Sequence, residues 1–311
     1  MAKIVVIGSA NTDMTIRAEK IPAPGETVVG GVFASAPGGK GANQAVAAAR
    51  AGGEVTFVAR VGADSLGEEA IKGYERDGID VGKIVRDPTN ATGVALIMVD
   101  ASGQNSISVA SGANFALSPE DVDAASDAIR DADVVVCQLE TPIPTVERAA
   151  RLAADAGVPF ILDPAPAPSA PLPGSLLKLT TIVKPNELEA SALTGVAVTD
   201  EASAFAAAEK LLAAGVKLAI VTLGAAGAVM ASSDGKRLTC PPCRVDAVDS
   251  TAAGDAWTGA FAVALAEGQS PEAAAEFATK AAAISVTRPG AQPSLPTRAE
   301  IRDLATEDAR P

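Results

Sequence analysis

The chain has 311 residues, of which 48% are hydrophobic and 20% are charged, a composition typical of an ordered globular protein. Its net charge of −13 and the lack of any basic run argue against nucleic acid or an anionic membrane as a partner. The sequence contains no histidine, which excludes Ser-His-Asp catalysis, histidine zinc sites and histidine proton shuttles. General-base work must therefore fall to a carboxylate, a lysine or a tyrosine.

The first apolar segment, residues 3–8, is too short to span a membrane and is followed at once by polar residues. It also lacks a cleavage-like site, so it is better explained as a buried first strand than as a signal peptide. We therefore expect a cytoplasmic protein.

Asn11 and Asp13 follow directly after this predicted strand. Polar side chains just past the end of a buried parallel strand lie where α/β proteins hold ligands, so both could hydrogen-bond hydroxyl groups. The alternative is an Asx turn, in which the side chain bonds the local backbone. Glu140 ends a later predicted strand and falls at the same ligand-binding edge.

Two regions, residues 14–36 and 91–110, contain short strand-like pieces broken by proline or glycine, with no helix within either region. They predict a small antiparallel sheet that covers the strand ends as a lid. From residue 55 onward, strands alternate with helices, which predicts a doubly wound, mainly parallel α/β sheet flanked by helices. No repeat or linker interrupts the chain, so we expect one domain over residues 1–311.

A glycine-rich segment at residues 37–45 opens an alanine-rich helix. It matches neither a Walker A loop nor a dinucleotide-binding GxGxxG motif, because Gly41 and Gln44 stand where those motifs need other residues. Lys40 and Asn43 are its polar side chains. The alternative is a tight loop that only packs against the sheet.

Asn186 and Glu189 are three residues apart at a predicted helix start and therefore share one face of that helix. An amide and a carboxylate on one face suit Mg²⁺ bound through its own waters. A helix capping box explains the same spacing equally well. The later turn at residues 222–227 is rich in glycine and alanine and could pass close to a nucleotide.

The segment at residues 249–261 carries the strongest chemical signal. Ala252, Ala253 and Gly254 leave backbone N–H groups uncovered where a helix begins, and the helix dipole favours an anion there. Asp255 adds a carboxylate at the rim of this anion site. We interpret it as the base that accepts a proton from an attacking group during phosphoryl transfer. The alternative is that Asp255 caps the helix.

Ten short motifs occur in the order seen in one family: GSANTD from Gly8, PGET from Pro24, GGKGANQAVAAA from Gly38, TGVALI from Thr92, QLETP from Gln138, DPAPAP from Asp163, PNE from Pro185, TLGAAG from Thr222, AAGD from Ala252 and VTRPGAQPS from Val286. With these motifs the chain resembles the ribokinase-like (PfkB) carbohydrate kinases along essentially its whole length. The resemblance implies ATP-dependent phosphorylation of D-ribose at the 5-hydroxyl, with Asp255 as general base and the amides of residues 252–255 as the anion hole. Alternatives are a kinase for another free sugar or a nucleoside, such as deoxyribose or a ketohexose derivative, and a catalytically silent sugar-binding relative.

The resemblance also implies residue roles. The sugar would be held by Asn11, Asp13, Gly39, Lys40, Gly41, Asn43, Glu140 and Asp255. The nucleotide side would comprise Asn186, Thr222, Gly224, Gly227, Gly254 and Thr279. A monovalent-cation site, mostly of backbone carbonyls, would comprise Asp249, Thr251, Ser285, Arg288, Gly290 and Ser294. Mg²⁺ would accompany ATP near Asn186 and Glu189, K⁺ would activate the enzyme, and two copies would pair through the lid.

The chain departs from the family pattern at four positions, in three segments. Asp163 stands where an asparagine is common, Trp257-Thr258 replaces a Phe-Asn pair, and Thr279 replaces a histidine or asparagine near the adenine. These departures affect the expected adenine and sugar contacts and leave the phosphoryl-transfer motif intact.

Overall fold

The computed structural model describes residues 2–304, so residue 1 and residues 305–311, the two ends of the expected domain, lie outside the described residues. The main sheet contains β1 (Lys3–Ile7), β4 (Glu54–Gly62), β5 (Ile84–Asp87), β8 (Val134–Cys137), β9 (Phe160–Leu162), β10 (Ile182–Val183), β11 (Leu218–Thr222), β12 (Ala228–Ser232) and β13 (Arg237–Cys240). The lid sheet contains β2 (Asn11–Arg17), β3 (Val32–Gly38), β6 (Gly93–Val99) and β7 (Asn105–Ala110).

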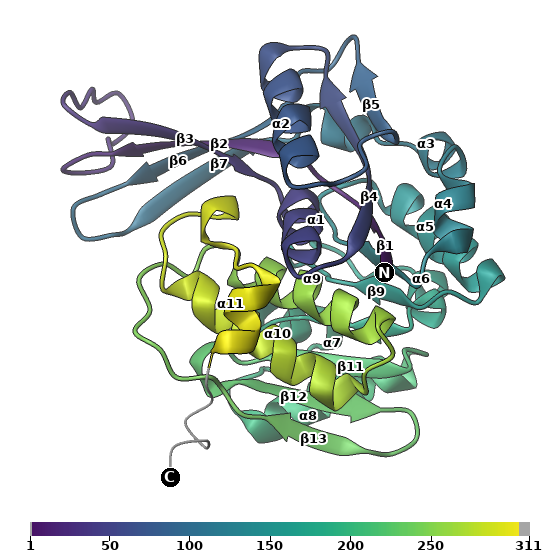
Figure 1. The fold of residues 1–311 in the computed structure, drawn as a ribbon. Helices are drawn as coiled ribbons and strands as arrows, with labels where there is room; N and C mark the ends of the chain where they lie inside the picture. Colours follow the sequence, from purple (N-terminus) through teal and green to yellow (C-terminus); the bar gives the residue numbers. More distant parts are fainter. Residues whose placement is uncertain (1, 305–311) are drawn as a thin grey trace.

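The helices lie mainly between the strands in sequence (Figure 1). They are α1 (Lys40–Arg50), α2 (Ser65–Arg76), α3 (Pro119–Asp123), α4 (Ser126–Asp131), α5 (Ile143–Ala156), α6 (Gly174–Leu179), α7 (Glu187–Thr194), α8 (Glu201–Ala213), α9 (Ala253–Ala266), α10 (Pro271–Val286) and α11 (Arg298–Asp303), with short 3-10 helices η1 (Gly112–Ala116), η2 (Gly224–Ala226) and η3 (Gln292–Ser294). Within the described residues, no helix combines the length and apolar character that a membrane span needs.

The main sheet has the strand order β13-β12-β11-β10-β9-β8-β1-β4-β5. Every pairing from β11 across to β5 is parallel, and only β12 and β13 add antiparallel pairings at one edge. The chain runs from β1 to β4 on one side and returns later to β8 on the other side of β1. Ligands of such sheets bind where the strand order reverses, outside the carboxyl ends of the strands. The ends of β1 and β8 therefore mark the expected crevice.

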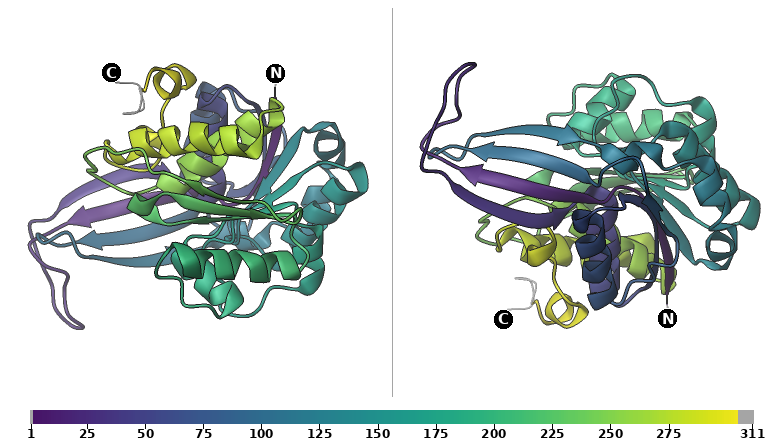
Figure 2. Two further views of the ribbon diagram at one scale, coloured as in Figure 1. Left: turned by 90° about the horizontal axis from the view of Figure 1, so that it is seen from below. Right: turned by 90° about the horizontal axis from the view of Figure 1, so that it is seen from above.

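Helices cover both faces of this sheet, as two views of the ribbon show (Figure 2). Along β1, Ile4 and Val6 join a core built with α1, α2, α9 and α10, whereas Val5 and Ile7 join a second core with α3 to α8. Side chains alternate between the two faces of a strand, so a continuous apolar run such as β1 can be buried on both. The doubly wound, mainly parallel architecture is confirmed.

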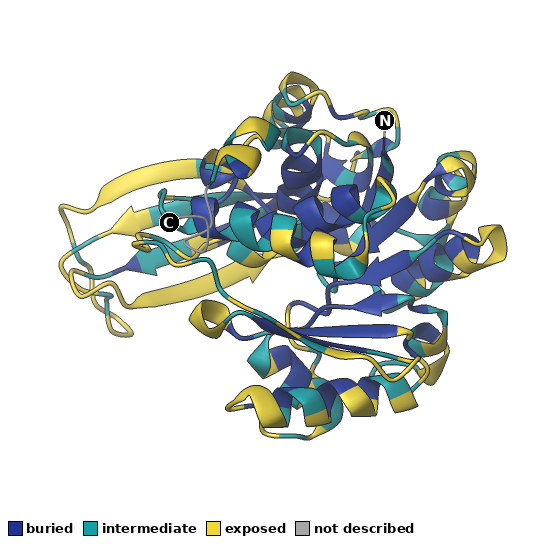
Figure 3. Ribbon diagram, turned by 60° about the horizontal axis from the view of Figure 1, so that its bottom comes forward, coloured by how far each residue is buried: buried dark blue, intermediate teal, exposed yellow. Residues whose placement is uncertain are grey.

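The lid sheet projects beyond the helices, and its outer strands β3 and β7 are largely exposed, whereas β2 and β6 are mostly half-buried or buried (Figure 3). Its strand order is β3-β2-β6-β7, with antiparallel outer pairs and a parallel central pair of β2 with β6. The expectation of an antiparallel sheet therefore holds for the outer pairs only. The chain passes through β4 and β5 between β2 and β6, so these two strands need not form a hairpin. The lid also begins earlier than expected, since Asn11 and Asp13 lie on β2 rather than in an Asx turn.

Helices α1 and α9 pack closely through small residues. Gly259 on α9 makes this approach possible, because a Cβ atom there would lie 2.6 Å from Ala47 Cβ and 2.7 Å from the Gln44 carbonyl oxygen. Such distances are too short for any side chain, so the two backbones are in direct contact. The contact brings the first turn of α1 beside the first turn of α9.

We expect Gly259→Ala to destabilise the protein by about 1–3 kcal/mol, because the added methyl group overpacks the α1–α9 contact. Gly73→Ala in α2 is a matched control, since its Cβ atom would meet nothing closer than an Arg76 nitrogen at 3.8 Å. There, helix propensity alone favours alanine by up to about 1 kcal/mol. Urea unfolding midpoints should move in opposite directions. Equal stabilisation by both substitutions would contradict the packing argument.

Candidate active site

The ends of β1 and β8 are joined through Glu140. The Ser9 hydroxyl donates to Glu140 Oε2 at 2.5 Å, and the Lys40 backbone N–H donates to the same oxygen at 3.0 Å. Gly39, which precedes α1, has a φ of 90°, and a Cβ atom there would lie 2.7 Å from the Asn11 nitrogen. Only glycine suits such a position. The first turn of α1 is thereby held against both strand ends.

Asn11 is buried, and its side-chain orientation is fixed by a residue that the sequence motifs did not indicate. Asn114, in η1, donates from Nδ2 to Asn11 Oδ1 at 2.7 Å and accepts the Ala10 backbone N–H at 2.8 Å. With its oxygen occupied, the Asn11 amide presents N–H donors to a ligand.

Several acidic side chains lie near Lys40 at this crevice. Burial, followed by Glu140 and Asp255, raises the pKa of Asp13 to about 6. Burial alone would lower the pKa of Lys40, but its acidic neighbours, led by Asp255 and Asp163, raise it well above its usual value. Lys40 therefore stays charged and offsets part of this negative charge.

Asp255 is 5% exposed and sits in the first turn of α9. Asn43 Nδ2 donates to its Oδ2 and Gln44 Nε2 donates to its Oδ1, both at 2.9 Å. The N-cap of α9 is Ala252, with no side-chain capping bond, so the interpretation of Asp255 as a cap is wrong. Burial is the main reason why the pKa of Asp255 is raised, whereas Lys40, Asn43 and Gln44 act to lower it.

The backbone around Ala252 is unusual, because Ala252 has a φ of 59° and is the one non-glycine residue with positive φ in the described part of the chain. The Ala253 N–H donates to the Ser250 carbonyl at 3.2 Å. That leaves Gly254 and Asp255 as the first-turn residues whose N–H groups no intrahelical acceptor can satisfy. Within the helix, these two N–H groups of the expected anion hole are therefore available to an anion.

A cavity of about 790 Å³ opens beside this turn. Its lining includes residues expected on the sugar, phosphate and nucleotide sides: Lys40, Asn186, Glu189, Thr222, Gly224, Gly227, Ala252, Ala253, Gly254, Asp255 and Thr279. Segments far apart in the sequence therefore meet around one space. Of the departures from the motif pattern, Asp163 and Trp257 line it as well, and Trp257 Nε1 donates to the Thr279 hydroxyl at 3.3 Å.

Asn186 and Glu189 form a capping box at the start of α7. Asn186 Oδ1 accepts the Glu189 N–H at 2.9 Å, and Glu189 Oε2 accepts the Asn186 N–H at 2.8 Å. Glu189 is buried at the cavity, and burial, followed by Asp163, raises its pKa. The described residues contain no group of three or more acidic, histidine or cysteine side chains suited to hold a metal directly. The spacing thus serves capping, and magnesium binding through water stays a prediction.

Asp249 ties two loops together beside the anion turn. Its Oδ1 accepts the Thr251 backbone N–H at 2.9 Å, and its Oδ2 accepts the Gly290 N–H at 2.8 Å. The hydroxyls of Ser285 and Ser294 donate to local carbonyls of their own segments. Arg288 pairs with Glu300 at 2.6 Å and lowers the pKa of Glu300 to about 2. The charge of Arg288 is therefore offset by Glu300 on α11, outside the loop of residues 285–294.

The family model for pfkB carbohydrate kinases matches residues 1–298 of the chain. The chain belongs to the pfkB family of carbohydrate kinases. It is accordingly an enzyme, a kinase that acts on carbohydrates, as the resemblance of its motifs implied.

Several curated relatives of this pfkB kinase match along nearly its whole length. It is 45% identical to a ribokinase of Haemophilus influenzae, over 97% of either chain. It is 38% identical to a deoxyribokinase of Salmonella typhi, over 94% of this chain and 95% of the other. It is also 44% identical to a bifunctional ribokinase/ribose-5-phosphate isomerase A of Fructilactobacillus sanfranciscensis, of which it spans only 57%. The solved structure of Arabidopsis thaliana ribokinase complexed with ribose and ATP superposes with a TM-score of 0.92, at 36% identity, covering 97% of this chain and 98% of that chain.

The pfkB kinase also holds a buried cluster that sequence reasoning missed. The carboxylate of Asp163 is contacted by Gln44, Lys184 and Thr258. Gln44 also bonds Asp255 Oδ1, whereas Asn43 bonds the other oxygen of Asp255, Oδ2. Asp163 was visible as a departure from the family pattern, but its partners come from α1, the segment after β10, and α9. No short motif contains that combination.

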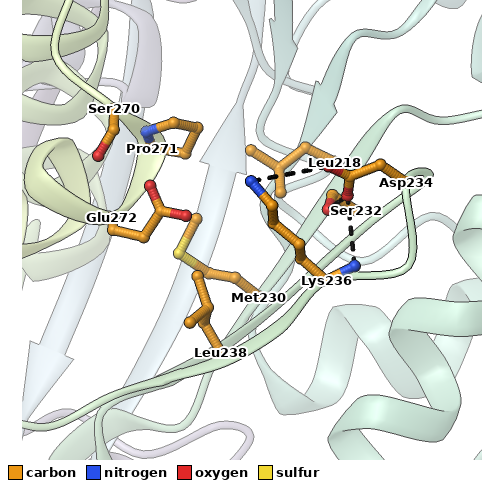
Figure 4. A pocket seen from close by; sticks show the side chains of 9 residues that line it. All are labelled: Leu218, Met230, Ser232, Asp234, Lys236, Leu238, Ser270, Pro271 and Glu272. Atoms are coloured by element: carbon orange, nitrogen blue, oxygen red, sulfur yellow. Dashed lines mark hydrogen bonds and ion pairs between the residues drawn. The ribbon is translucent and has the colours of Figure 1, made fainter.

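A second cavity, of about 250 Å³, lies between β11, β12, β13 and the start of α10 (Figure 4). Two of its charged lining residues pair with each other, since Lys236 Nζ lies 3.8 Å from Asp234 Oδ2. None of the residues expected to carry chemistry lines it. The residues expected to act on substrates that line a cavity therefore lie at the larger one.

Proposed function

We propose that this kinase transfers the γ-phosphoryl group of ATP to the 5-hydroxyl of D-ribose, using one kinase domain that extends over the chain. The observation that carries the proposal is the placement of Asp255. It is a buried carboxylate in the first turn of α9, with both oxygens held by side-chain amides of α1. The relative solved with ribose and ATP supports this choice of substrates.

The sugar binds at the crevice through Asn11, Asp13, Asn43 and Glu140, together with Lys40 and the close backbone at Gly39 and Gly41. These residues supply both N–H donors and carboxylate acceptors, as the hydroxyl groups of a polyol require. Asp13, with a pKa of about 6, is ionised at neutral pH and accepts hydroxyl hydrogens. This density of hydroxyl-binding groups favours a free sugar over a nucleoside. A deoxyribose kinase is the second candidate, because a curated deoxyribokinase is among the relatives.

In the transfer step, the primary hydroxyl attacks the γ-phosphorus, its proton passes to the Asp255 carboxylate, and ADP leaves. The transition state is loose, so a weak base suffices and positioning dominates. The N–H groups of Gly254 and Asp255 stabilise the charge that develops on the phosphoryl oxygens. Asp255 returns to its ionised form when the proton is released with the products. A silent sugar-binding relative would need neither the base nor this turn.

The nucleotide lies in the larger cavity, along Asn186, the turn at residues 222–227, and Thr279. Mg²⁺, when bound with ATP, would offset the charge of the phosphates. Glu189 suits an ion that keeps its own waters, because it is a buried carboxylate at the cavity with one oxygen already engaged in the capping box. Asn186 presents its amide at the same helix end.

The first test is a phosphorylation assay against pentoses, hexoses and nucleosides with ATP. D-Ribose should give the highest kcat/KM, with phosphorus NMR reporting a 5-phosphate. Asp255→Asn should lower kcat by at least about a hundredfold, the scale for a positioned general base, while sugar still binds.

A higher kcat/KM for deoxyribose or another sugar would replace ribose as the substrate. Comparable turnover by the Asp255→Asn variant would exclude Asp255 as the base, whichever sugar is used.

The proposal also includes K⁺ as an activating ion between the loop of Asp249 and Thr251 and the loop of residues 285–294. Carbonyl-lined pockets suit a large monovalent cation, and this ion would fix the anion turn without touching substrate. K⁺ should raise kcat several-fold over Na⁺ or Li⁺ at matched ionic strength. A bulky organic cation serves as the control for salt effects. Equal rates with all these cations would remove the ion from the mechanism.

The kinase, in this proposal, pairs with a second copy through the lid. Val32, Phe33, Leu96, Ile107 and Val109 on the lid strands are each more than half exposed. Sedimentation equilibrium should give twice the 30.9 kDa chain mass. Phe33→Lys with Ile107→Lys should halve it, whereas Leu188→Lys, at a still more exposed leucine on α7, should not. A monomeric wild-type protein would contradict the pairing.

A further inference from the structure

The side-chain amide of Gln44 lies between two carboxylates. Its Nε2 donates to Asp255 Oδ1 and to Asp163 Oδ2, each at 2.9 Å, and the residue is fully buried. An amide nitrogen has two hydrogens, so both are used, one for each acid. The amide thus separates two groups that would otherwise face each other as like charges.

The orientation of this amide is itself fixed. Gln138, buried at the end of β8, donates from Nε2 to Gln44 Oε1 at 2.7 Å. A flipped Gln44 would direct its oxygen at both carboxylates and its NH₂ group at the NH₂ group of Gln138. The structure therefore allows one arrangement, in which Asp255 receives a hydrogen.

Asp163 anchors the other end of the bridge. Its Oδ2 also accepts from Lys184 Nζ at 3.0 Å and from the Thr258 hydroxyl at 3.1 Å. Lys184 Nζ also donates to the Gly254 carbonyl oxygen at 3.2 Å, and the Thr258 hydroxyl, whose one hydrogen serves either acceptor, lies 2.9 Å from that carbonyl oxygen. That carbonyl and the Asp255 N–H belong to one planar peptide unit. The same cluster therefore holds the Asp255 carboxylate through Gln44 and the Asp255 backbone N–H through Gly254.

Burial explains why these polar groups bond one another but not why their hydrogen bonds converge on Asp255. Asn43 holds Asp255 Oδ2 from one side and Gln44 holds Oδ1 from the other, which sets the plane of the carboxylate. We infer that Gln44 is a positioning residue, which fixes the Asp255 carboxylate for proton transfer by bridging it to the Asp163–Lys184 pair. The inference rests on the proposed role of Asp255 as base.

The test is Gln44→Met, which keeps length and volume but removes both donors. We expect kcat to fall on the order of tenfold to a hundredfold, the cost of a misplaced catalytic group, with the KM of each substrate within about threefold. The acid limb of the kcat–pH profile should move to higher pH, because the pKa of Asp255 loses a hydrogen bond that lowers it while burial still raises it.

Gln44→Glu gives a second variant of native shape, and its added acid should move the acid limb in the same direction. Thr145→Val is the matched control. The Thr145 hydroxyl is fully buried and donates to the Leu117 carbonyl at 2.7 Å, in the other core. The Thr145→Val variant loses a buried hydrogen bond, as the Gln44 variants do, but should keep the wild-type kcat and pH profile.

The outcomes separate this inference from the proposed function. If Asp255→Asn lost activity but both Gln44 variants kept the wild-type kcat and acid limb, Gln44 would have no positioning role. A loss of kcat without a shift of the acid limb, or one matched by Thr145→Val, would indicate a purely structural role and overturn the inference. Wild-type turnover by Asp255→Asn would instead refute the proposed base.

Discussion

The carboxylate of Asp255 lies inside the protein at the start of a helix, and a buried charge needs hydrogen bonds or a counter-charge to remain ionised. Here Asn43 and Gln44 supply the hydrogen bonds from α1, and Lys40 supplies the counter-charge. These residues can reach Asp255 because α1 and α9 approach at Gly259 with no side chain between them. The glycine-rich segment before α1 and the small residues before α9 thus form one site, although they are more than two hundred residues apart in the sequence.

The charge distribution of the site follows from the same constraint. A protein of net charge −13 must receive an anionic nucleotide next to several carboxylates. Two lysines, Lys40 and Lys184, lie at the cavity, and each is set among acidic groups rather than standing alone. The helix N-terminus then adds donors without adding a full charge. The side-chain amides donate hydrogen bonds to the carboxylates and so allow them to lie close together. Without these amides, the site would need additional lysines to offset the same negative charge.

Much of this arrangement could be predicted from the sequence, and the omissions have physical reasons. The buried run of β1, the polar residues after β1 and β8, and the small residues before Asp255 each carry a local signal. They predict the sheet that the structure shows, and they indicate the crevice and the base that we propose. The parallel pairing of β2 with β6 was not, because strand pairing across a long crossover has no local signature. Gln44 lies in an alanine-rich helix, and its hydrogen-bond partners Asp163 and Asp255 are 119 and 211 residues away in the sequence. A local pattern therefore could not indicate its role. Asp163 was noticed as a departure, but its lysine partner required the fold.

The central claim is that Asp255 faces the sugar hydroxyl and the γ-phosphate together. A crystal structure of the kinase with D-ribose and a non-hydrolysable ATP analogue tests this most directly. The account predicts the 5-hydroxyl about 2.6–3.2 Å from an Asp255 carboxylate oxygen, with the γ-phosphate facing the N–H groups of Gly254 and Asp255. A sugar whose hydroxyl points away from Asp255, or a γ-phosphate held elsewhere in the cavity, would contradict it.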